Sequence, residues 1–156
     1  MTDEEFMQKA IDLASENVKA GVGGPFGAVI VKNGQIVAEA TNTVTSTNDS
    51  TAHAEVNAIR KACANLKTFD LSGCVIYSSC EPCPMCLSAL YWAHVDKIYI
   101  SATKRIAAKA GFDDAFIYKE LDTPKVRRRV QQVRLLSENG NQPFDLWNSK
   151  TDKIEY

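Results

Sequence analysis

The sequence predicts an α/β protein, a three-layer α/β/α sandwich in which helices cover both faces of a central mixed β-sheet. Three observations support this class. An amphipathic helical segment opens the chain, a β-hairpin signature follows it, and later short apolar runs alternate with helical segments. Alternation of this kind after a hairpin favours a sheet with both parallel and antiparallel pairs. The 156 residues, 45% of them hydrophobic, suffice for one domain over residues 1–156.

The first helix is expected over residues 3 to about 19. Apolar residues recur there with a helical period, acidic residues crowd the first turn, and Gly21 lies just past the end. A hairpin is predicted next, in "GPFGAVIVKNGQIVAEAT", because Asn33-Gly34 joins two β-branched runs. The polar stretch "NTVTSTNDST" predicts a loop.

The middle of the chain is expected to alternate helices with strands. A helix over residues 52 to about 65 would have Ser50 or Thr51 as its N-cap. The short apolar run "GCVIYSS" predicts a buried strand, and a third helix is expected from "CEPCP" to near His94. "KIYISA" predicts another strand, and "TKRIAAKAG" a fourth helix that Gly111 ends.

The end of the chain is less regular. A basic stretch follows Pro124, and "VQQVRLL" after it predicts a further strand. A last helix is expected from about Pro143.

Charge and hydropathy exclude several classes of partner. The formal net charge of −1 and the pI of about 6.1 provide no general positive field for nucleic acid or acidic lipid. The first residues, "MTDEEFMQKA", lack the basic and apolar regions of a secretory signal, and no apolar run has the length of a membrane span. We therefore expect a cytoplasmic protein with neither a nucleic-acid nor a membrane partner.

The stretch "CEPCPMC" contains three of the five cysteines. Because the cysteine count is odd and clustered, metal binding or redox chemistry is favoured over a disulfide framework. Pro82 and Pro84 fit the start of a helix, where a missing amide costs least. Cys83 and Cys86 would then share one face of its first turn, and the helix dipole there favours thiolates. Two thiolates at this spacing suit zinc.

The other ligands can be sought among only two histidines, His53 and His94. His94 lies at the far end of the same helix, roughly 12 Å from Cys86, so it is expected to cap that helix. His53 begins another helix and is the better ligand. Three protein ligands with an open fourth position are typical of catalytic zinc. Cys80 could instead close the site as a structural fourth ligand, but the zinc-deaminase signature omits such a residue.

Glu55 distinguishes a catalytic from a structural zinc site. It stands in His53-Ala54-Glu55, upstream of Pro82-Cys83-Pro84-Met85-Cys86, and this pair of motifs matches the H-x-E and P-C-x-x-C signature of zinc deaminases. A carboxylate beside a metal-activated water can take a proton and return it to a leaving amine. The alternative is a solvated helix glutamate.

These motifs resemble those of the cytidine deaminase superfamily and, within it, the bacterial guanine deaminases. The resemblance runs through "GGPFGAVIVKNG", "NDSTAHAEVNAIRKAC", "YSSCEPCPMCLSALYWA", "AGFDDAFIYKEL" and the closing "EY". It implies a cytidine deaminase-like fold, with one zinc ion held by His53, Cys83 and Cys86 and with Glu55 as the proton shuttle. Two departures stand out: His94 replaces an expected arginine after "YWA", and residues 125 to 142 match loosely.

The resemblance also implies a pocket for a flat purine. Phe26 and Trp92 would be its walls, Asn42 and Asp114 would bond the ring edges, and Ala54 would contact the substrate. Tyr156 would close the site from a neighbouring subunit, because the family forms homodimers that exchange C-terminal segments. From the residues alone, Phe26 and Trp92 could equally belong to the core, and Asp113 and Asp114 could form a turn.

The implied reaction is hydrolytic deamination of guanine to xanthine and ammonia, a step of purine catabolism, with Asp114 assisting at the amine. Alternatives are a tRNA adenosine deaminase and a deaminase of another small ring such as cytosine or a triazine. The one basic run, "KVRRRV", is weak support for the former. A non-catalytic zinc-stabilised module would need Cys80 as a ligand and no role for Glu55.

Overall fold

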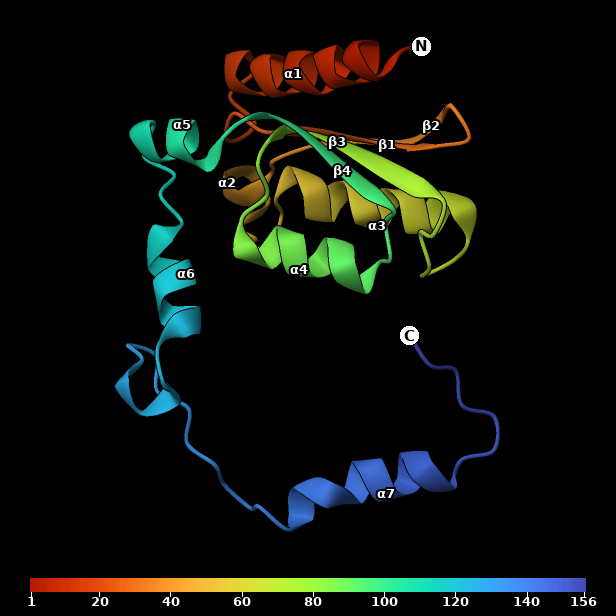
Figure 1. Cartoon of the computed structure of the whole chain (residues 1–156), viewed down its shortest axis with the longest axis vertical. Coiled ribbons are helices and arrows are strands. Elements are labelled where there is room, and N and C mark those ends of the chain that lie inside the picture. The colour runs from red at the N-terminus through yellow and green to blue at the C-terminus, as the bar shows by residue number, and fades with distance from the viewer. The chain divides into compact units, whose positions relative to one another are not determined.

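The computed structural model describes residues 1–156 as two compact units, Met1–Asp114 and Ala115–Tyr156 (Figure 1). The first unit contains the sheet, and the second is made of helices and extended segments. No helix in either unit combines the length and the apolar character that crossing a membrane requires.

The sheet of the first unit has four strands in the order β2-β1-β3-β4. β1 (Gly27–Lys32) pairs antiparallel with β2 (Gln35–Thr41) and with β3 (Cys74–Cys80), and β3 pairs parallel with β4 (Lys97–Ala102). The predicted mixed sheet is thus confirmed. The hairpin turn is also confirmed, because Asn33 and Gly34 take φ of 50° and 74°, the left-handed conformations that such a tight turn requires.

Strand register collects the functional segments at one end of the sheet. Gly27 pairs with Thr41, Ala28 with Ser78, and Cys80 with Ala102. The chain therefore enters β1, leaves β2 and leaves β3 at the same end, so segments distant in sequence become neighbours.

Helices cover both faces of this sheet, as predicted (Figure 1). α1 (Asp3–Lys19) lies on one face, while α3 (Ala54–Leu66) and α4 (Pro84–Trp92) lie on the other. The alternation of strand side chains separates two cores. Val29 and Val31 pack with α1, whereas Ala28 and Ile30 pack with residues of α3 and α4.

Two predictions around α3 are wrong. The loop before α3 contains a short helix, α2 (Val44–Thr47), and the N-cap of α3 is His53 instead of Ser50 or Thr51. The reason for the second error is local: the Thr51 hydroxyl and amide both donate to Asp49 Oδ1, at 2.6 and 2.9 Å. Thr51 is thereby committed to a turn, and the helix starts two residues later.

Other boundaries agree with the prediction. Gly21 and Gly111 follow α1 and α5 (Lys104–Lys109) with positive φ. α4 ends at Trp92, and His94 follows with φ of 60° while its amide donates to Tyr91 O. The C-cap itself is Ala93, and His94 follows it at the end of the helix.

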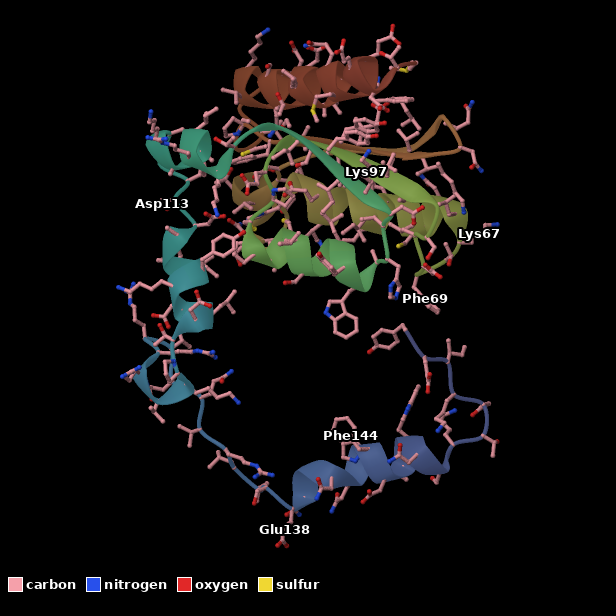
Figure 2. The ribbon with its side chains drawn as sticks, in the orientation of Figure 1. Lys67, Phe69, Lys97, Asp113, Glu138 and Phe144 are labelled. Atoms are coloured by element: carbon pink, nitrogen blue, oxygen red, sulfur yellow. The ribbon has the colours of Figure 1, made fainter.

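The second unit contains α6 (Ala115–Asp122), two single-turn 3₁₀ helices, η1 (Lys125–Arg127) and η2 (Asn139–Asn141), and α7 (Gln142–Ser149). The expected terminal helix is present, whereas α6 was not foreseen. The strand predicted for "VQQVRLL" is wrong, because residues 130–136 hydrogen-bond to no neighbouring strand. None of the residues 115–156 is buried, and Phe144, for example, projects from α7 with 68% of its surface exposed (Figure 2).

Candidate metal centre and active site

The predicted metal ligands meet at the starts of two helices. His53 is the N-cap of α3, Cys83 is the N-cap of α4, and Cys86 lies in the first turn of α4. Pro84 occupies the first helical position, where its missing amide leaves no bond unmade. The His53 side chain makes no capping hydrogen bond to α3, so its imidazole remains available to a metal.

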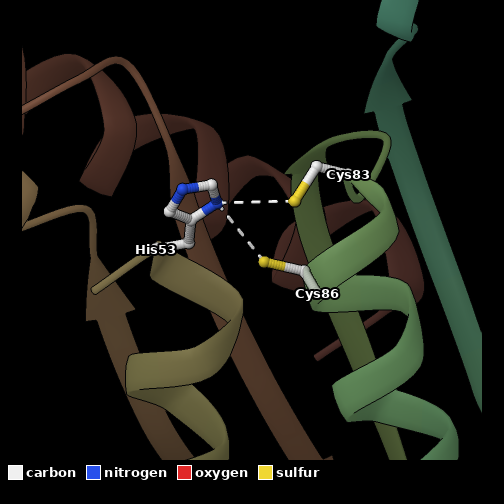
Figure 3. Close-up of side chains that lie close together, drawn as sticks. All are labelled: His53, Cys83 and Cys86. Atoms are coloured by element: carbon white, nitrogen blue, oxygen red, sulfur yellow. Dashed lines mark hydrogen bonds between the residues drawn. The ribbon is translucent and has the colours of Figure 1, made fainter. Parts of the chain in front are cut away.

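The geometry of these three residues fits zinc. His53 Nδ1 lies 3.6 Å from Cys83 Sγ and 3.4 Å from Cys86 Sγ (Figure 3). All three ligand atoms lie within 4.8 Å of one another. In a tetrahedral zinc site, bond lengths of about 2.3 Å to sulfur and 2.0–2.1 Å to nitrogen separate these atoms by about 3.6 Å. One imidazole and two thiols therefore form a suitable donor set with a suitable spacing.

The thiols are prepared for metal binding. A hydrogen bond from the Cys86 thiol lowers the pKa of Cys83 to about 4, and contact with His53 adds to this effect. The same hydrogen bond raises the pKa of Cys86. The pair thus favours the thiolate at Cys83 and keeps the proton on Cys86, and metal binding would release that proton.

Cys80 and His94 stand apart from this group. Cys80 ends β3, its Sγ lies 3.8 Å from Thr103 O, and burial raises its pKa to about 11. It is a neutral thiol and not one of the three clustered donors. His94 follows α4, at the opposite end from Cys83.

Glu55 is a buried carboxyl group in the first turn of α3, two residues after His53. Only 5% of its surface is exposed, which excludes the solvated glutamate considered above. Burial raises its pKa, and the group interacts with the Cys86 thiol. A carboxyl group with a raised pKa next to metal ligands is suited to taking a proton and returning it.

Four of the predicted substrate residues, Phe26, Asn42, Ala54 and Asp114, lie around the same end of the sheet. Phe26 precedes β1 and packs edge-on against Phe112, with ring centroids 5.0 Å apart at 87°. The backbone amide of Asn42 donates to Phe26 O at 3.2 Å, and Asn42 itself is 6% exposed. Ala54 is fully buried beside His53. Asp114 is half-buried, and this burial raises its pKa.

The other two predicted residues, Trp92 and Tyr156, are both exposed side chains. Trp92 is six residues beyond Cys86, about 9 Å further along α4, and 66% exposed. Tyr156 is the last residue of the second unit and 79% exposed. An apolar cleft of about 630 Å³ between α1 and α5 is lined by Phe26, Phe112 and Cys80, among others, but by none of the three ligands. The cleft therefore adjoins the aromatic pair and not the metal site.

Sequence reasoning missed Phe112 and the buried Asn17. Asn17 continues the buried face of α1 formed by Phe6, Ala10 and Ala14, so its helical spacing could have identified it as a buried polar residue. Phe112 carries no such local signal, because its ring contact is with a residue 86 positions earlier.

The fold and this site define a zinc-dependent deaminase domain. Residues 1–102 match the cytidine and deoxycytidylate deaminase zinc-binding region, and the chain belongs to this family. Its cofactor is zinc.

Individual relatives within this family are similar to the chain over most of its length. The chain is 51% identical to a guanine deaminase from Bacillus subtilis over 100% of both chains. A crystal structure of guanine deaminase from that organism covers 100% of this chain and 99% of its own, with a TM-score of 0.97. A tRNA-specific adenosine deaminase from Aquifex aeolicus is 38% identical over 84% of this chain and 83% of its own length. A guanine deaminase structure from Nitrosomonas europaea matches at 34% identity and a TM-score of 0.69, covering 72% of this chain and 65% of that one.

Replacing single cysteines tests the ligand set. We expect Cys83→Ala and Cys86→Ala to lose the bound zinc, because each removes one of three clustered donors, whereas Cys80→Ala should retain one zinc per chain. Elemental analysis of the purified variants measures this directly. Loss of zinc from Cys80→Ala would make Cys80 a ligand and the site a closed structural one.

Proposed function

We propose that the chain catalyses hydrolytic deamination of guanine to xanthine and ammonia. The observation that carries this proposal is the buried Glu55 beside the His53, Cys83 and Cys86 donors, in a chain that is 51% identical along its full length to a guanine deaminase. When bound by these donors, zinc lowers the pKa of water and polarises the reacting centre.

Glu55 handles the protons. It takes a proton from the attacking water, whose oxygen forms a bond to C2 of the ring, and delivers that proton to a ring nitrogen. A further proton transfer carries the proton of the new C2 hydroxyl to the amine. The bond between C2 and the amine then breaks as the C2 carbonyl forms, and ammonia leaves. Asp114 assists this transfer at the exocyclic amine. The raised pKa of each carboxyl group supports these roles, because a shuttle must hold the proton as well as release it.

The proposed substrate pocket combines Phe26, Asn42 and Ala54 at this end of the sheet with Trp92, which lies further along α4. Phe26 stacks against the purine, and Trp92 forms a second wall. Ala54 contacts the ring beside the ligands. Asn42 donates a hydrogen bond to an acceptor on the ring edge. An apolar pocket with a few directed polar groups is typical of a site for a small planar ligand.

A second candidate, tRNA adenosine deamination, is suggested by the Aquifex relative but is less well supported. That relative matches at lower identity and over less of the chain. Within the basic run "KVRRRV", the guanidinium group of Arg128 already donates hydrogen bonds to the backbone oxygens of Leu121 and Thr123. A non-catalytic zinc module is disfavoured because it gives no reason for burying the Glu55 carboxyl group beside the metal ligands, which costs free energy.

We also propose a cytoplasmic homodimer that exchanges residues 115–156. The support is the absence of buried residues in this segment, although it exposes several large apolar side chains (Val130, Val133, Leu135, Leu136, Phe144 and Leu146). An exposed apolar surface of this size is typical of a protein–protein interface. Tyr156 of one chain would then complete the site of its partner. The five free thiols fit a reducing compartment.

A panel of free bases and tRNA tests the substrate. We expect zinc-loaded protein to release ammonia from guanine, and Glu55→Gln to retain zinc and fold but lose turnover by about three orders of magnitude or more. Preferential release from cytosine, a triazine or tRNA would reject guanine as the substrate. Near-normal turnover by Glu55→Gln would reject its role as the shuttle.

The adjacent aspartates supply a matched control for the second proton transfer. Asp114→Asn should reduce guanine turnover much more than Asp113→Asn, because two adjacent side chains cannot both face one ligand. Small, equal effects of the two substitutions would show that neither aspartate has a catalytic role.

Removing Tyr156 tests the exchange. We expect the truncated protein to bind zinc and to dimerise but to deaminate guanine about tenfold more slowly, equivalent to roughly 1.4 kcal/mol of lost transition-state stabilisation. Mixed dimers refolded from truncated and Glu55→Ala chains should regain part of the activity, since one site then holds both Glu55 and Tyr156. Full activity of the truncated enzyme would make Tyr156 dispensable, and inactive mixed dimers would place its contribution within one chain.

A further inference from the structure

Asn17 is a buried polar residue far from the metal ligands in sequence. It lies in the last turn of α1 with 5% of its surface exposed. Its side-chain Nδ2 donates to Gly24 O and to Asn42 O, both at 2.9 Å. The two acceptors belong to different segments, the loop before β1 and the end of β2. One amide group thus joins α1 to the two segments that carry Phe26 and Asn42.

The loop that Asn17 holds runs unusually close to Asn42. A Cβ at Gly23 would collide with Asn42 O, so only glycine allows this approach. Gly24 O also accepts the amide of Phe26 at 2.8 Å. Asn17 therefore holds the backbone of Asn42 directly and that of Phe26 through the shared acceptor Gly24 O.

The same packing fixes which atom Asn42 can offer to a ligand. Its Oδ1 accepts from Val44 N at 3.1 Å and from Gly24 N at 3.4 Å. These bonds assign Oδ1 to the backbone and leave Nδ2 as the donor for a ring acceptor. No buried side-chain nitrogen or oxygen lacks a hydrogen-bond partner, so this Nδ2 keeps contact with the surface.

We infer that Asn17 is a positioning residue for guanine binding: it holds the loop of residues 23–26 against the end of β2 and thereby aims Asn42 Nδ2 and the Phe26 ring at the base. This inference rests on the proposed function. Asn17 touches no reacting atom, and its effect passes through Asn42 and Phe26.

The chemistry of the site favours asparagine. Two carbonyl acceptors require two donor hydrogens on one short side chain, which only an amide nitrogen supplies at this length. Aspartate has the same shape but only acceptors, and would face two carbonyl oxygens without a bond. Glutamine would add a methylene group to a closely packed place.

Steady-state kinetics with guanine tests the inference. We expect KM to rise at least about tenfold in Asn17→Ala and Asn17→Asp while kcat changes less than about threefold, because ring binding is weakened and Glu55 is left in place. Zinc content should be unchanged, since no ligand lies on α1. Asn17→Ser keeps one hydrogen-bond donor and should give an intermediate KM. It replaces Asn17→Asp as the test variant if that protein fails to fold.

Asn65→Ala is the matched control. Asn65 also donates its amide to the backbone of β2, at 2.8 Å to Val37 O, but at an exposed position away from the site. Its replacement should leave KM unchanged. Equal KM values for wild-type protein and all Asn17 variants, even with a lowered urea midpoint, would reduce Asn17 to a purely structural residue and overturn the inference.

Amide hydrogen exchange separates this inference from the proposed function. In Asn17→Ala, the amides of Gly24 and Val44 should exchange at least about tenfold faster, because their acceptor Asn42 Oδ1 is no longer held, whereas those of β3 should not change. This readout needs no substrate. Failure of wild-type protein to deaminate guanine would reject the function alone, and unchanged exchange at both amides would reject the positioning role.

Discussion

The site depends on the contact between the first turns of α3 and α4, where the imidazole of His53 meets the thiols of Cys83 and Cys86. Both helices follow segments that leave the same end of the sheet, so strand register sets the distance between their starts. The antiparallel pairing of β1 with β2 brings Phe26 and Asn42 together, and the pairing of β1 with β3 brings them to this end. The register of the strands thus determines where the metal ligands, Glu55 and the proposed substrate residues lie.

Burial gives this contact its chemical character. Glu55 and Cys86 are almost fully enclosed, and two thiolates and a carboxylate would repel one another in so small a space without a compensating cation. A zinc ion at the three donors balances that charge and explains why such groups are gathered in an otherwise apolar layer. Polar side chains, among them Asn17 and Ser79, hold the backbone around these groups: Ser79 Oγ accepts the amide of Gly27 at 2.9 Å.

The parts that could be predicted from sequence were those with a local signal. Asn33-Gly34 predicts a hairpin because these two residues readily adopt the left-handed conformations that a tight turn requires. The three-residue spacing of Cys83 and Cys86 places both thiols on the same side of a helix start. The prediction of a strand at 130–136 was wrong because a strand-like side-chain pattern does not show whether a sheet edge is available for pairing. Asn17 escaped notice because its carbonyl partners lie 7 and 25 residues away, and the edge-on contact of Phe112 spans a longer distance still.

The three donors are expected to hold zinc in an open site with one imidazole and two thiolate ligands. Zinc K-edge X-ray absorption on the purified zinc-loaded protein tests it most directly. We expect two sulfur scatterers at about 2.3 Å and two nitrogen or oxygen scatterers at about 2.0–2.1 Å, the latter being His53 and an exchangeable water. A shell of three sulfurs would show that Cys80 completes the coordination and would contradict a catalytic site.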